Sequence, residues 1–513
     1  MMYKSDTHTL PRGKPEEFGL PSRAMLSFLD SLEGADFQVH SLMLLRHGHV
    51  LAEAWWHPYD RTCRRYLYSL SKSFTSTAVG FAVQEGLLDV QSRVVSFFEA
   101  DLPPIISANL QAMRVKDLLT MSTGHGTDTT ITIFPEGLVN WAQVILSAPV
   151  DFYPGTHFLY NSGATYLLSC IVQQLTGQTV LEYLTPRLFG PLGIDGMTWE
   201  TCPRGINTGG WGLSLSTEDL AKFGQFCLQR GRWEDRQPLS AAWIDEATSA
   251  QAPSDSEERE KQPTDWNQGY GYQFWRCQHN AYRADGAYGQ YCVVMPDQDA
   301  VLALTSETPD MQDVLDRVWQ HLLPAMSPSP LTNEPHDREL LQSRIASLQI
   351  PLPSADQFPV EFDKYSGKQF KLQENPLGLR ALSFSFGRDS SRLQLFDDYD
   401  EYQLVFGYQT WKCSETWLPI LQPHLMSLLL RGKDHSPMRV AAYGQWIELG
   451  LFRLVIQYLE TPHSTTLAFN FQDERIRLEI SSSMAKPSDP FYAASKISLS
   501  GVLQPSTSPV AVK

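Results

Sequence analysis

The sequence predicts an α+β protein of two domains: a domain in which helices flank an antiparallel sheet, followed by an all-β domain. Two apolar strand patterns, at residues 38–56 and 268–305, stand at opposite ends of a long segment that is rich in helical patterns. After about residue 357 the pattern changes to alternation of apolar and polar residues, which is typical of half-buried strands. The length of 513 residues also exceeds what one hydrophobic core usually holds.

The composition is that of a globular protein and argues against several classes of partner. Hydrophobic residues make up 42% of the chain and charged residues 19%. The formal net charge of −16 argues against nucleic acid and against an anionic membrane surface, because both attract clustered Lys and Arg. No run of 18 apolar residues occurs. We therefore predict no nucleic-acid partner and no membrane span.

The cysteines and the first residues bear on the compartment. Seven cysteines are dispersed through the chain without any C-x-x-C pair, a pattern that fits reduced thiols. Prolines and charges interrupt residues 1–22, where a signal peptide would have a continuous apolar stretch. These features predict a cytoplasmic protein that holds no metal and no cofactor.

Residues 38–56 predict two strands joined by a turn at His47-Gly48-His49. The two histidines also raise the alternative of a metal site. No acidic residue or cysteine lies nearby in the sequence, and histidines that flank a hairpin glycine are more often turn residues. We favour the turn.

A helix is predicted from Ser69, because Phe74, Ala78, Phe81 and Ala82 recur at three- and four-residue spacing. Gly86 is placed to end it. Further helices are predicted at 115–121, at 164–175 and from Ser216, where a Ser-Thr-Glu-Asp run suits a helix start.

Strands are predicted at 268–276 and 288–305, the second with a turn at Pro296-Asp297, and the polar residues 251–267 before them predict a surface loop. Residues 325–336 are rich in Pro and Ser and indicate a linker, with a short helix at 338–348. The predicted domains are 1–325 and 357–513, connected by 326–356. In the second domain, alternating runs such as 382–386, 467–471 and 476–480 indicate a barrel or a sandwich.

Ser69 and Lys72 are three residues apart at the start of an apolar helix, so both side chains lie on nearly the same face. A serine hydroxyl is a weak nucleophile unless a neighbouring base accepts its proton, and a partly desolvated lysine serves as such a base. The S-x-x-K spacing alone is weak evidence, since Ser483 and Lys486 have it too. Only Ser69 is followed by a small-residue apolar helix.

The segment YSLSKSFTS (68–76) resembles the nucleophile motif of class C β-lactamases and the related esterases and D-aminopeptidases of the penicillin-recognising family. The resemblance extends through much of residues 15–325, including LLTMSTGH (118–125) and GGWGLSLSTEDLAKFG (209–224). It implies an antiparallel sheet of five to nine strands beside an all-helical subdomain, with the active site between them. It also implies that Ser69 attacks a carbonyl, that Lys72 assists, and that a downstream tyrosine acts as base.

That tyrosine is Tyr160, in PGTHFLYNSGATY, although in isolation it would be taken as a buried aromatic residue. The family pattern is Tyr-x-Asn, whereas this chain has Asn161 one position early and Ser162 at the Asn position. A serine has a shorter reach and a single donor, which affects substrate binding more than the nucleophile. We assign Asn161 and Ser162 to substrate binding.

The third family motif is Lys-Thr-Gly or His-x-Gly on an edge strand, and the matching segment here is Ala284-Asp285-Gly286-Ala287. The resemblance implies an oxyanion hole made by the backbone N–H groups of Ser69 and Ala287, which survive side-chain changes. Asp285 and Gly286 are assigned to substrate binding, although Asp285 alone is equally a turn residue. Ala284 lacks the basic group that holds the carboxylate of a β-lactam, so penicillin turnover is expected to be weak or absent.

The predicted function is a serine hydrolase that acts on a small-molecule ester or amide through an acyl-Ser69 intermediate. Three alternatives stay open: an acyltransferase with the same intermediate, a cell-wall peptidase, and a catalytically impaired binding or regulatory module. The altered second and third motifs favour the last, whereas the intact set of Ser69, Lys72 and Tyr160 speaks against it. The sequence also leaves open whether the protein forms a homo-oligomer. It leaves open three roles for the β domain: gating the site, binding substrate or mediating dimerisation.

Overall fold

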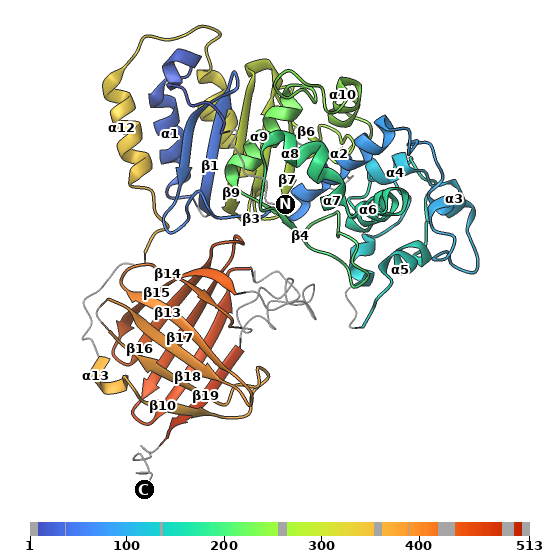
Figure 1. Cartoon of the computed structure of the whole chain (residues 1–513). Helices are drawn as coiled ribbons and strands as arrows, with labels where there is room; N and C mark the ends of the chain where they lie inside the picture. The colour runs from blue at the N-terminus through green and yellow to red at the C-terminus, as the bar shows by residue number, and fades with distance from the viewer. Residues whose placement is uncertain are drawn as a thin grey trace. The chain divides into compact units, whose positions relative to one another are not determined.

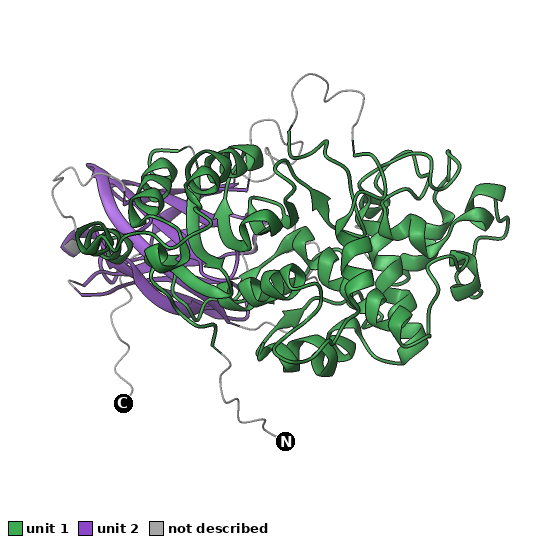
Figure 2. Ribbon diagram, turned by 90° about the horizontal axis from the view of Figure 1, so that it is seen from above, with its two compact units in different colours: residues 1–348 green, residues 349–513 purple. Residues whose placement is uncertain are grey.

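The computed structural model describes residues 9–35, 37–133, 137–254, 264–352, 362–387, 389–418, 437–484 and 497–504. The chain divides into two compact units, residues 1–348 and 349–513, which Figure 2 shows in different colours. The first unit mixes helices with an antiparallel sheet, and the second is built from strands (Figure 1). This confirms the predicted fold class.

The sheet of the first unit has six strands in the order β2-β1-β9-β8-β7-β6, and every adjacent pair is antiparallel. Their bounds are Gln38–Arg46 (β1), His49–Trp55 (β2), Trp275–Arg276 (β6), Tyr282–Gly286 (β7), Gln290–Met295 (β8) and Ala300–Glu307 (β9). The two regions in which the sequence predicts strands meet in this sheet, where β1 pairs with β9. The predicted hairpin forms at His47-Gly48, where the His47 ring contacts Asp299 at 2.7 Å.

The strand predicted over 268–276 is reduced to β6. Gly269 has a φ of +102° and Gln273 a φ of +64°, and neither value is compatible with an extended strand. The backbone N–H of Gln273 instead donates to Leu119 O at 3.1 Å. The segment therefore crosses to the helical part of the unit, where it contacts the site described below.

The helices of the first unit are Ser22–Leu32 (α1), Ser71–Gln84 (α2), Ala108–Ala112 (α3), Val115–Leu119 (α4), Trp141–Ser147 (α5), Ser162–Thr176 (α6), Val180–Leu184 (α7), Gly190–Leu192 (α8), Thr217–Leu228 (α9), Ala241–Thr248 (α10), Met311–Arg317 (α11) and Pro335–Ala346 (α12). Helix α9 packs against β1, β8 and β9, whereas α2 to α7 gather beside the sheet (Figure 1). A small sheet in the order β3-β5-β4 (Arg65–Tyr66, Leu213–Leu215, Thr198–Trp199) lies in the same unit. Helix α12, expected within the connecting segment, packs on α1 and belongs to the first unit.

Helix α2 is buried on all sides from Ser71 to Ala82. The spacing of its apolar residues indicated one buried face, but the polar residues between them are buried as well. Its hydroxyl side chains satisfy backbone groups of distant loops: Ser73 donates to Gln273 O at 2.6 Å, and Thr75 to Gly209 O at 2.9 Å. These bonds fix the helix that carries Lys72 and that begins two residues after the candidate nucleophile Ser69.

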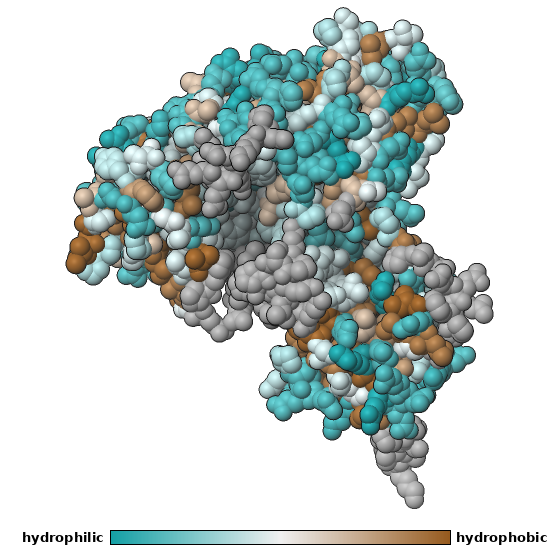
Figure 3. Space-filling view, turned by 180° about the vertical axis from the view of Figure 1, so that it is seen from behind, coloured by the Kyte–Doolittle hydropathy of each residue, from teal (hydrophilic) through white to brown (hydrophobic). Residues whose placement is uncertain are grey.

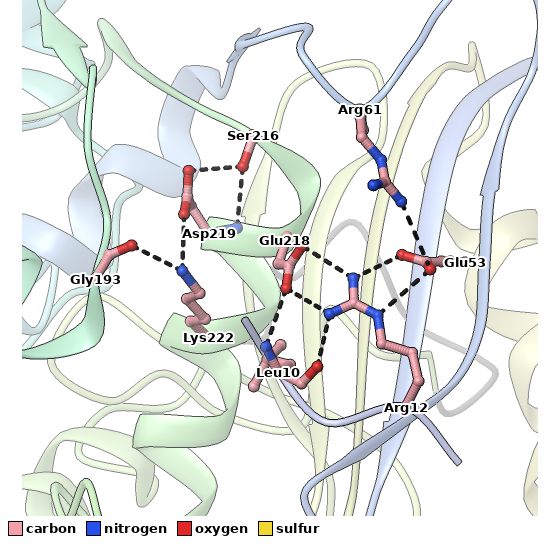
Figure 4. A network of polar contacts seen from close by, with 9 residues as sticks. All are labelled: Leu10, Arg12, Glu53, Arg61, Gly193, Ser216, Glu218, Asp219 and Lys222. Carbon is pink, nitrogen blue, oxygen red and sulfur yellow. Dashed lines mark hydrogen bonds and ion pairs between the residues drawn. The ribbon is translucent and has the colours of Figure 1, made fainter. Parts of the chain in front are cut away.

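The chain before α1 is attached to both the sheet and α9 (Figure 4). Arg12 places one guanidinium nitrogen 2.9 Å from Glu53 on β2 and another 2.9 Å from Glu218 at the start of α9. The backbone N–H of Leu10 donates to the same Glu218 carboxylate at 3.1 Å. The predicted start of α9 is confirmed, because Ser216 caps it by accepting a bond from Asp219 N at 3.2 Å.

Replacing Arg12 by Gln is expected to lower the free energy of unfolding by about 1 kcal/mol at pH 7, because two carboxylates lose their shared cation. Burial raises the pKa of Glu218, but the bonds from Arg12 outweigh it and the net pKa lies below 4.5. A lowered carboxylate pKa gives stability that is present above pH 4.5 and is lost as the pH falls. Urea unfolding of wild type and Arg12→Gln at pH 7 and pH 4 measures the difference in free energy of unfolding, which is expected to be smaller at pH 4. Arg61→Gln is the control, since Arg61 lies 3.8 Å from Glu53 and is mostly exposed; an equal loss in both variants contradicts the prediction.

The second unit is a closed barrel. Its strands are Gln369–Leu372 (β10), Ala381–Ser385 (β11), Ser391–Phe396 (β12), Glu401–Tyr408 (β13), Lys412–Thr416 (β14), Met438–Glu448 (β15), Leu451–Tyr458 (β16), Ser464–Gln472 (β17), Arg475–Ser482 (β18) and Ile497–Leu503 (β19). Among the described residues, nine of these strands form a ring that a parallel pairing of β13 with β15 closes, and β14 pairs with β15. Closure gives each of the nine ring strands a partner on both sides, and the alternating apolar side chains fill the core.

The alternative nucleophile Ser483 follows β18 at the end of a strand, and its hydroxyl accepts a bond from Ser464 N at 2.8 Å. Its partner in the motif, Lys486, lies outside the described residues, as does most of the predicted loop 251–267. No helix in the described ranges combines the length and the apolar character that a membrane crossing requires. On the face drawn in Figure 3, hydrophilic residues predominate and hydrophobic residues form small groups.

Candidate active site

Ser69 lies in a short 3-10 turn, Tyr68–Leu70, that leads directly into α2. Tyr68, the residue before it, has a φ of +50°, which is an unfavourable backbone conformation for a side chain of this size. Ser69 is partly exposed and lines a cavity of about 350 Å³. The other lining residues are Phe158, Leu159, Tyr160, Ser254, Trp266, Trp275, Asp285, Gly286, Ala287 and Met311.

Lys72 is 1% exposed and bonds to three oxygen atoms. Its Nζ donates to Ser69 Oγ at 2.9 Å, to Ser162 Oγ at 2.9 Å and to Gly210 O at 2.8 Å. Burial lowers the pKa of Lys72 to about 7, although the charges of Asp128 and Asp285 oppose that shift. Near neutral pH the amine is therefore partly unprotonated and lies within reach of the serine proton.

Tyr160 lines the same cavity as Ser69 and forms a side-chain hydrogen bond with it. Burial raises the pKa of Tyr160 well above its usual value, and the charge of Asp285 raises it further. The phenol is thus neutral at neutral pH, so Lys72 is the better base in the free protein. The Tyr160 ring stacks on Trp275 at 5.6 Å and lies 4.8 Å from Lys72 Nζ.

Ser162 and Asn161 differ in what they contact. The Ser162 hydroxyl accepts a hydrogen bond from Lys72 Nζ, and Ser162 is not among the described residues that line the cavity. Asn161 is buried and caps α6, where its Oδ1 accepts bonds from Gly163 N at 3.0 Å and from the Thr129 hydroxyl at 2.8 Å. Among the described residues, Asn161 does not line the cavity. Its Oδ1 therefore holds the Thr129 turn against α6, and the assignment of Asn161 to substrate binding stays a prediction.

The segment Asp285-Gly286-Ala287 lies at the end of β7, and all three residues line the cavity with Ser69. A Cβ on Gly286 would lie 2.0 Å from Leu67 O and 3.1 Å from Tyr68 Cβ. Only glycine permits this approach of β7 to the main chain that precedes Ser69. The contact brings the backbone of Ala287 to the same cavity as the nucleophile.

Asp285 forms a buried ion pair with Arg283, which sequence reasoning missed. Arg283 Nε donates to Asp285 Oδ2 at 2.7 Å, and Arg283 Nη1 donates to Asp265 O at 2.7 Å. The guanidinium lies 4.3 Å from the ring of Trp266 and 5.4 Å from that of Trp275. The alternation of residues along the YRADG strand gave a signal, since Arg283 and Asp285 lie on one face.

Asp128 is a second residue that sequence reasoning missed, and no local motif indicates it. Its Oδ1 accepts bonds from Ser162 N at 3.2 Å, from Thr130 N at 2.9 Å and from the Thr130 hydroxyl at 2.6 Å. Through Ser162 it supports the lysine, and its charge raises the pKa of Lys72. Asp128 therefore favours the protonated form of the base.

Asp128→Asn is expected to move the ascending limb of the pH–rate profile for Ser69 acylation below pH 7. Removing a negative charge lowers the pKa of the nearby amine, so more neutral Lys72 is present at pH 6. The rate of 4-nitrophenol release from an activated ester, followed from pH 5 to 9, measures the limb. Thr130→Val is the matched control, because it removes a hydrogen bond to Asp128 and keeps the charge; an unshifted limb in Asp128→Asn contradicts the prediction.

Comparison with known proteins places this chain in a family. The family model described as Beta-lactamase matches residues 32–325. The chain is 25% identical over 290 residues to a 6-aminohexanoate-dimer hydrolase of Paenarthrobacter ureafaciens, a match that covers 53% of this chain and 73% of that protein. It is 28% identical over 151 residues to a lovastatin esterase of Penicillium rubens, which covers 25% of this chain and 38% of the esterase.

A solved structure titled as a putative 6-aminohexanoate-dimer hydrolase from Bacillus anthracis has the same fold, with a TM-score of 0.51 and 17% identity. That likeness covers 64% of this chain and 89% of the other. The family model spans more than half of the chain and includes Ser69, Lys72, Tyr160 and Ala287. The chain therefore belongs to the beta-lactamase family of serine hydrolases.

Proposed function

We propose that this protein hydrolyses an ester or amide through an acyl-Ser69 intermediate. The observation that carries the proposal is the 2.9 Å contact between Lys72 Nζ and Ser69 Oγ at the floor of a cavity that also holds Tyr160. The neutral amine of Lys72 takes the proton of Ser69 as Oγ attacks the carbonyl carbon. The proton then passes, by way of the Tyr160 hydroxyl, to the oxygen or nitrogen of the leaving group.

In this mechanism the backbone N–H groups of Ser69 and Ala287 stabilise the oxyanion. Support comes from the contact of Gly286 with Leu67, which sets β7 beside the nucleophile turn. Water then attacks the acyl carbon, and Ser69 regains its proton as the acid leaves. The relatives named as a 6-aminohexanoate-dimer hydrolase and a lovastatin esterase agree with this chemistry, and each name describes that relative alone.

Labelling with a fluorophosphonate, read by intact mass, tests the proposal. Wild type and Ser483→Ala are expected to gain one adduct, and Ser69→Ala none. A chromogenic β-lactam is expected to be turned over slowly or not at all, since Ala284 stands at the position of the carboxylate-binding residue. An unlabelled but folded wild type would overturn the proposal in favour of a binding module.

A further inference from the structure

The cavity beside Ser69 has an apolar, aromatic wall that contains a single charged residue among the described residues that line it. Four of these residues are aromatic, namely Phe158, Tyr160, Trp266 and Trp275, and Leu159 and Met311 add aliphatic surface. The charged residue is Asp285, whose side chain is 5% exposed. A substrate group that enters the cavity therefore meets aromatic rings and one carboxylate.

Arg283, the cation that pairs with Asp285, does not line the cavity. Arg283 is fully buried, and it is not among the lining residues. Its guanidinium lies close to the rings of Trp266 and Trp275, and these two indoles do line the cavity. Its Nε is engaged by Asp285 at 2.7 Å. An incoming anion thus meets the carboxylate of the pair, while the arginine is behind the wall.

Asp285 is also unavailable to an incoming cation. Arg283 engages one of its oxygens, and the Trp275 indole donates a further hydrogen bond to the carboxylate. Binding a substrate ammonium would require it to share a carboxylate that already has a fixed partner. Burying a charged substrate group against this wall removes its hydration, and none of the described lining residues supplies a free counter-charge.

We propose that the Arg283–Asp285 pair selects esters and amides whose cavity-bound part is uncharged and apolar, and excludes substrates that carry a carboxylate there. This inference rests on the proposed function and names its substrate class. The pair acts as a specificity determinant: among the described residues that line the cavity, its carboxylate is the one charged group, and its guanidinium is not exposed to the cavity. The same wall accounts for poor binding of ligands whose recognition depends on a carboxylate.

Matched esters test the inference on the whole 513-residue chain. The first pair places the charge in the acyl group: 4-nitrophenyl hexanoate against mono-4-nitrophenyl adipate, with the methyl ester of the latter as the neutral control for length. The second pair places it in the leaving group: methyl 4-(butyryloxy)benzoate against 4-(butyryloxy)benzoate. In at least one pair the neutral ester is expected to have a kcat/KM about 100-fold higher than that of its anionic counterpart. The kcat/KM of the methyl ester control is expected to lie within about tenfold of that of 4-nitrophenyl hexanoate.

Equal rates within both pairs would overturn the inference and leave the proposed function intact. So would a higher rate for 4-nitrophenyl 6-aminohexanoate than for the hexanoate. An absence of both fluorophosphonate labelling and turnover would instead refute the proposed function itself. The two failures are therefore distinguishable.

Two variants connect the selectivity to the ion pair. Asp285→Asn leaves Arg283 without its carboxylate, so the anionic-to-neutral ratio of kcat/KM is expected to rise about tenfold or more. The double variant Arg283→Gln/Asp285→Asn removes both charges and is expected to keep the wild-type ratio. A ratio that changes equally in both variants would show that shape, and not charge, sets the selectivity. If Asp285→Asn does not fold, the substrate pairs on the wild type still decide the inference.

Discussion

Replacing Lys72 by Met is expected to lower kcat/KM for an activated ester by about 10³-fold, because Ser69 loses the only amine that contacts its hydroxyl among the described residues. Methionine has a similar length and no basic atom. Most of the loss is expected in kcat, since Lys72 lies beneath Ser69 and is not among the residues that line the cavity. Steady-state kinetics of 4-nitrophenyl ester hydrolysis, with fluorophosphonate labelling rates, measure the effect.

The same variant is not expected to unfold the protein. The pKa of Lys72 is lowered by burial from 10.5 to about 7, so between these values the unfolded chain binds a proton that the folded chain does not. The contribution of Lys72 to stability therefore falls as the pH falls from 10.5 to 7, and Lys72→Met compares best with wild type near or below pH 7.

Lys222→Met is the matched control for the loss of a buried lysine. Lys222 is 5% exposed on α9, and its Nζ donates to Gly193 O at 2.8 Å and contacts Asp219 (Figure 4). It lies outside the residues that line the cavity, so the control is expected to lose stability and keep its kcat. Activity in Lys72→Met close to that of wild type would refute the role of Lys72 as base.

Replacing Gly286 by Ala is expected to lower kcat by about 10²-fold to 10³-fold, comparable to the loss of one oxyanion donor. The added Cβ would lie 2.0 Å from Leu67 O, a main-chain atom that cannot move without moving Ser69. The steric conflict separates β7 from the nucleophile turn and misplaces the backbone of Ala287. Overpacking is expected to cost about 1–3 kcal/mol of stability as well.

Gly224→Ala separates the two effects. There a Cβ would lie 2.4 Å from Val301 Cγ1 and 2.7 Å from Cys292 Sγ, at the contact of α9 with the sheet. This variant is expected to lose similar stability without the loss in kcat, as measured by urea unfolding and ester hydrolysis. Ala287→Gly, which keeps the backbone N–H, is expected to keep most of the activity. A Gly286→Ala enzyme with unchanged kcat would contradict the oxyanion assignment.

The proximity of Ser69 and Lys72 was predictable from the sequence because it depends on local spacing. Ser69 lies in a 3-10 turn that runs directly into α2, so the three-residue separation brings its hydroxyl to Lys72 wherever that helix lies. Tyr160 was predictable as part of a family motif, and the alternating pattern of the second unit predicted strands. Whether that unit is a barrel or a sandwich was not predictable, because closure depends on the pairing of β13 with β15, which no local pattern encodes.

The sequence by itself determined the order of strands and helices, the nucleophile helix and the residue types available for chemistry. Tertiary structure decided which of Asn161 and Ser162 reaches Lys72. Asn161 caps α6, whereas the Ser162 hydroxyl accepts a hydrogen bond from Lys72 Nζ. It also decided the lowered pKa of Lys72, the charge of Asp128 beside it and the enclosure of Arg283 behind two indoles. These properties arise from burial and from contacts between segments far apart in the chain, whereas helix and strand patterns arise from neighbours.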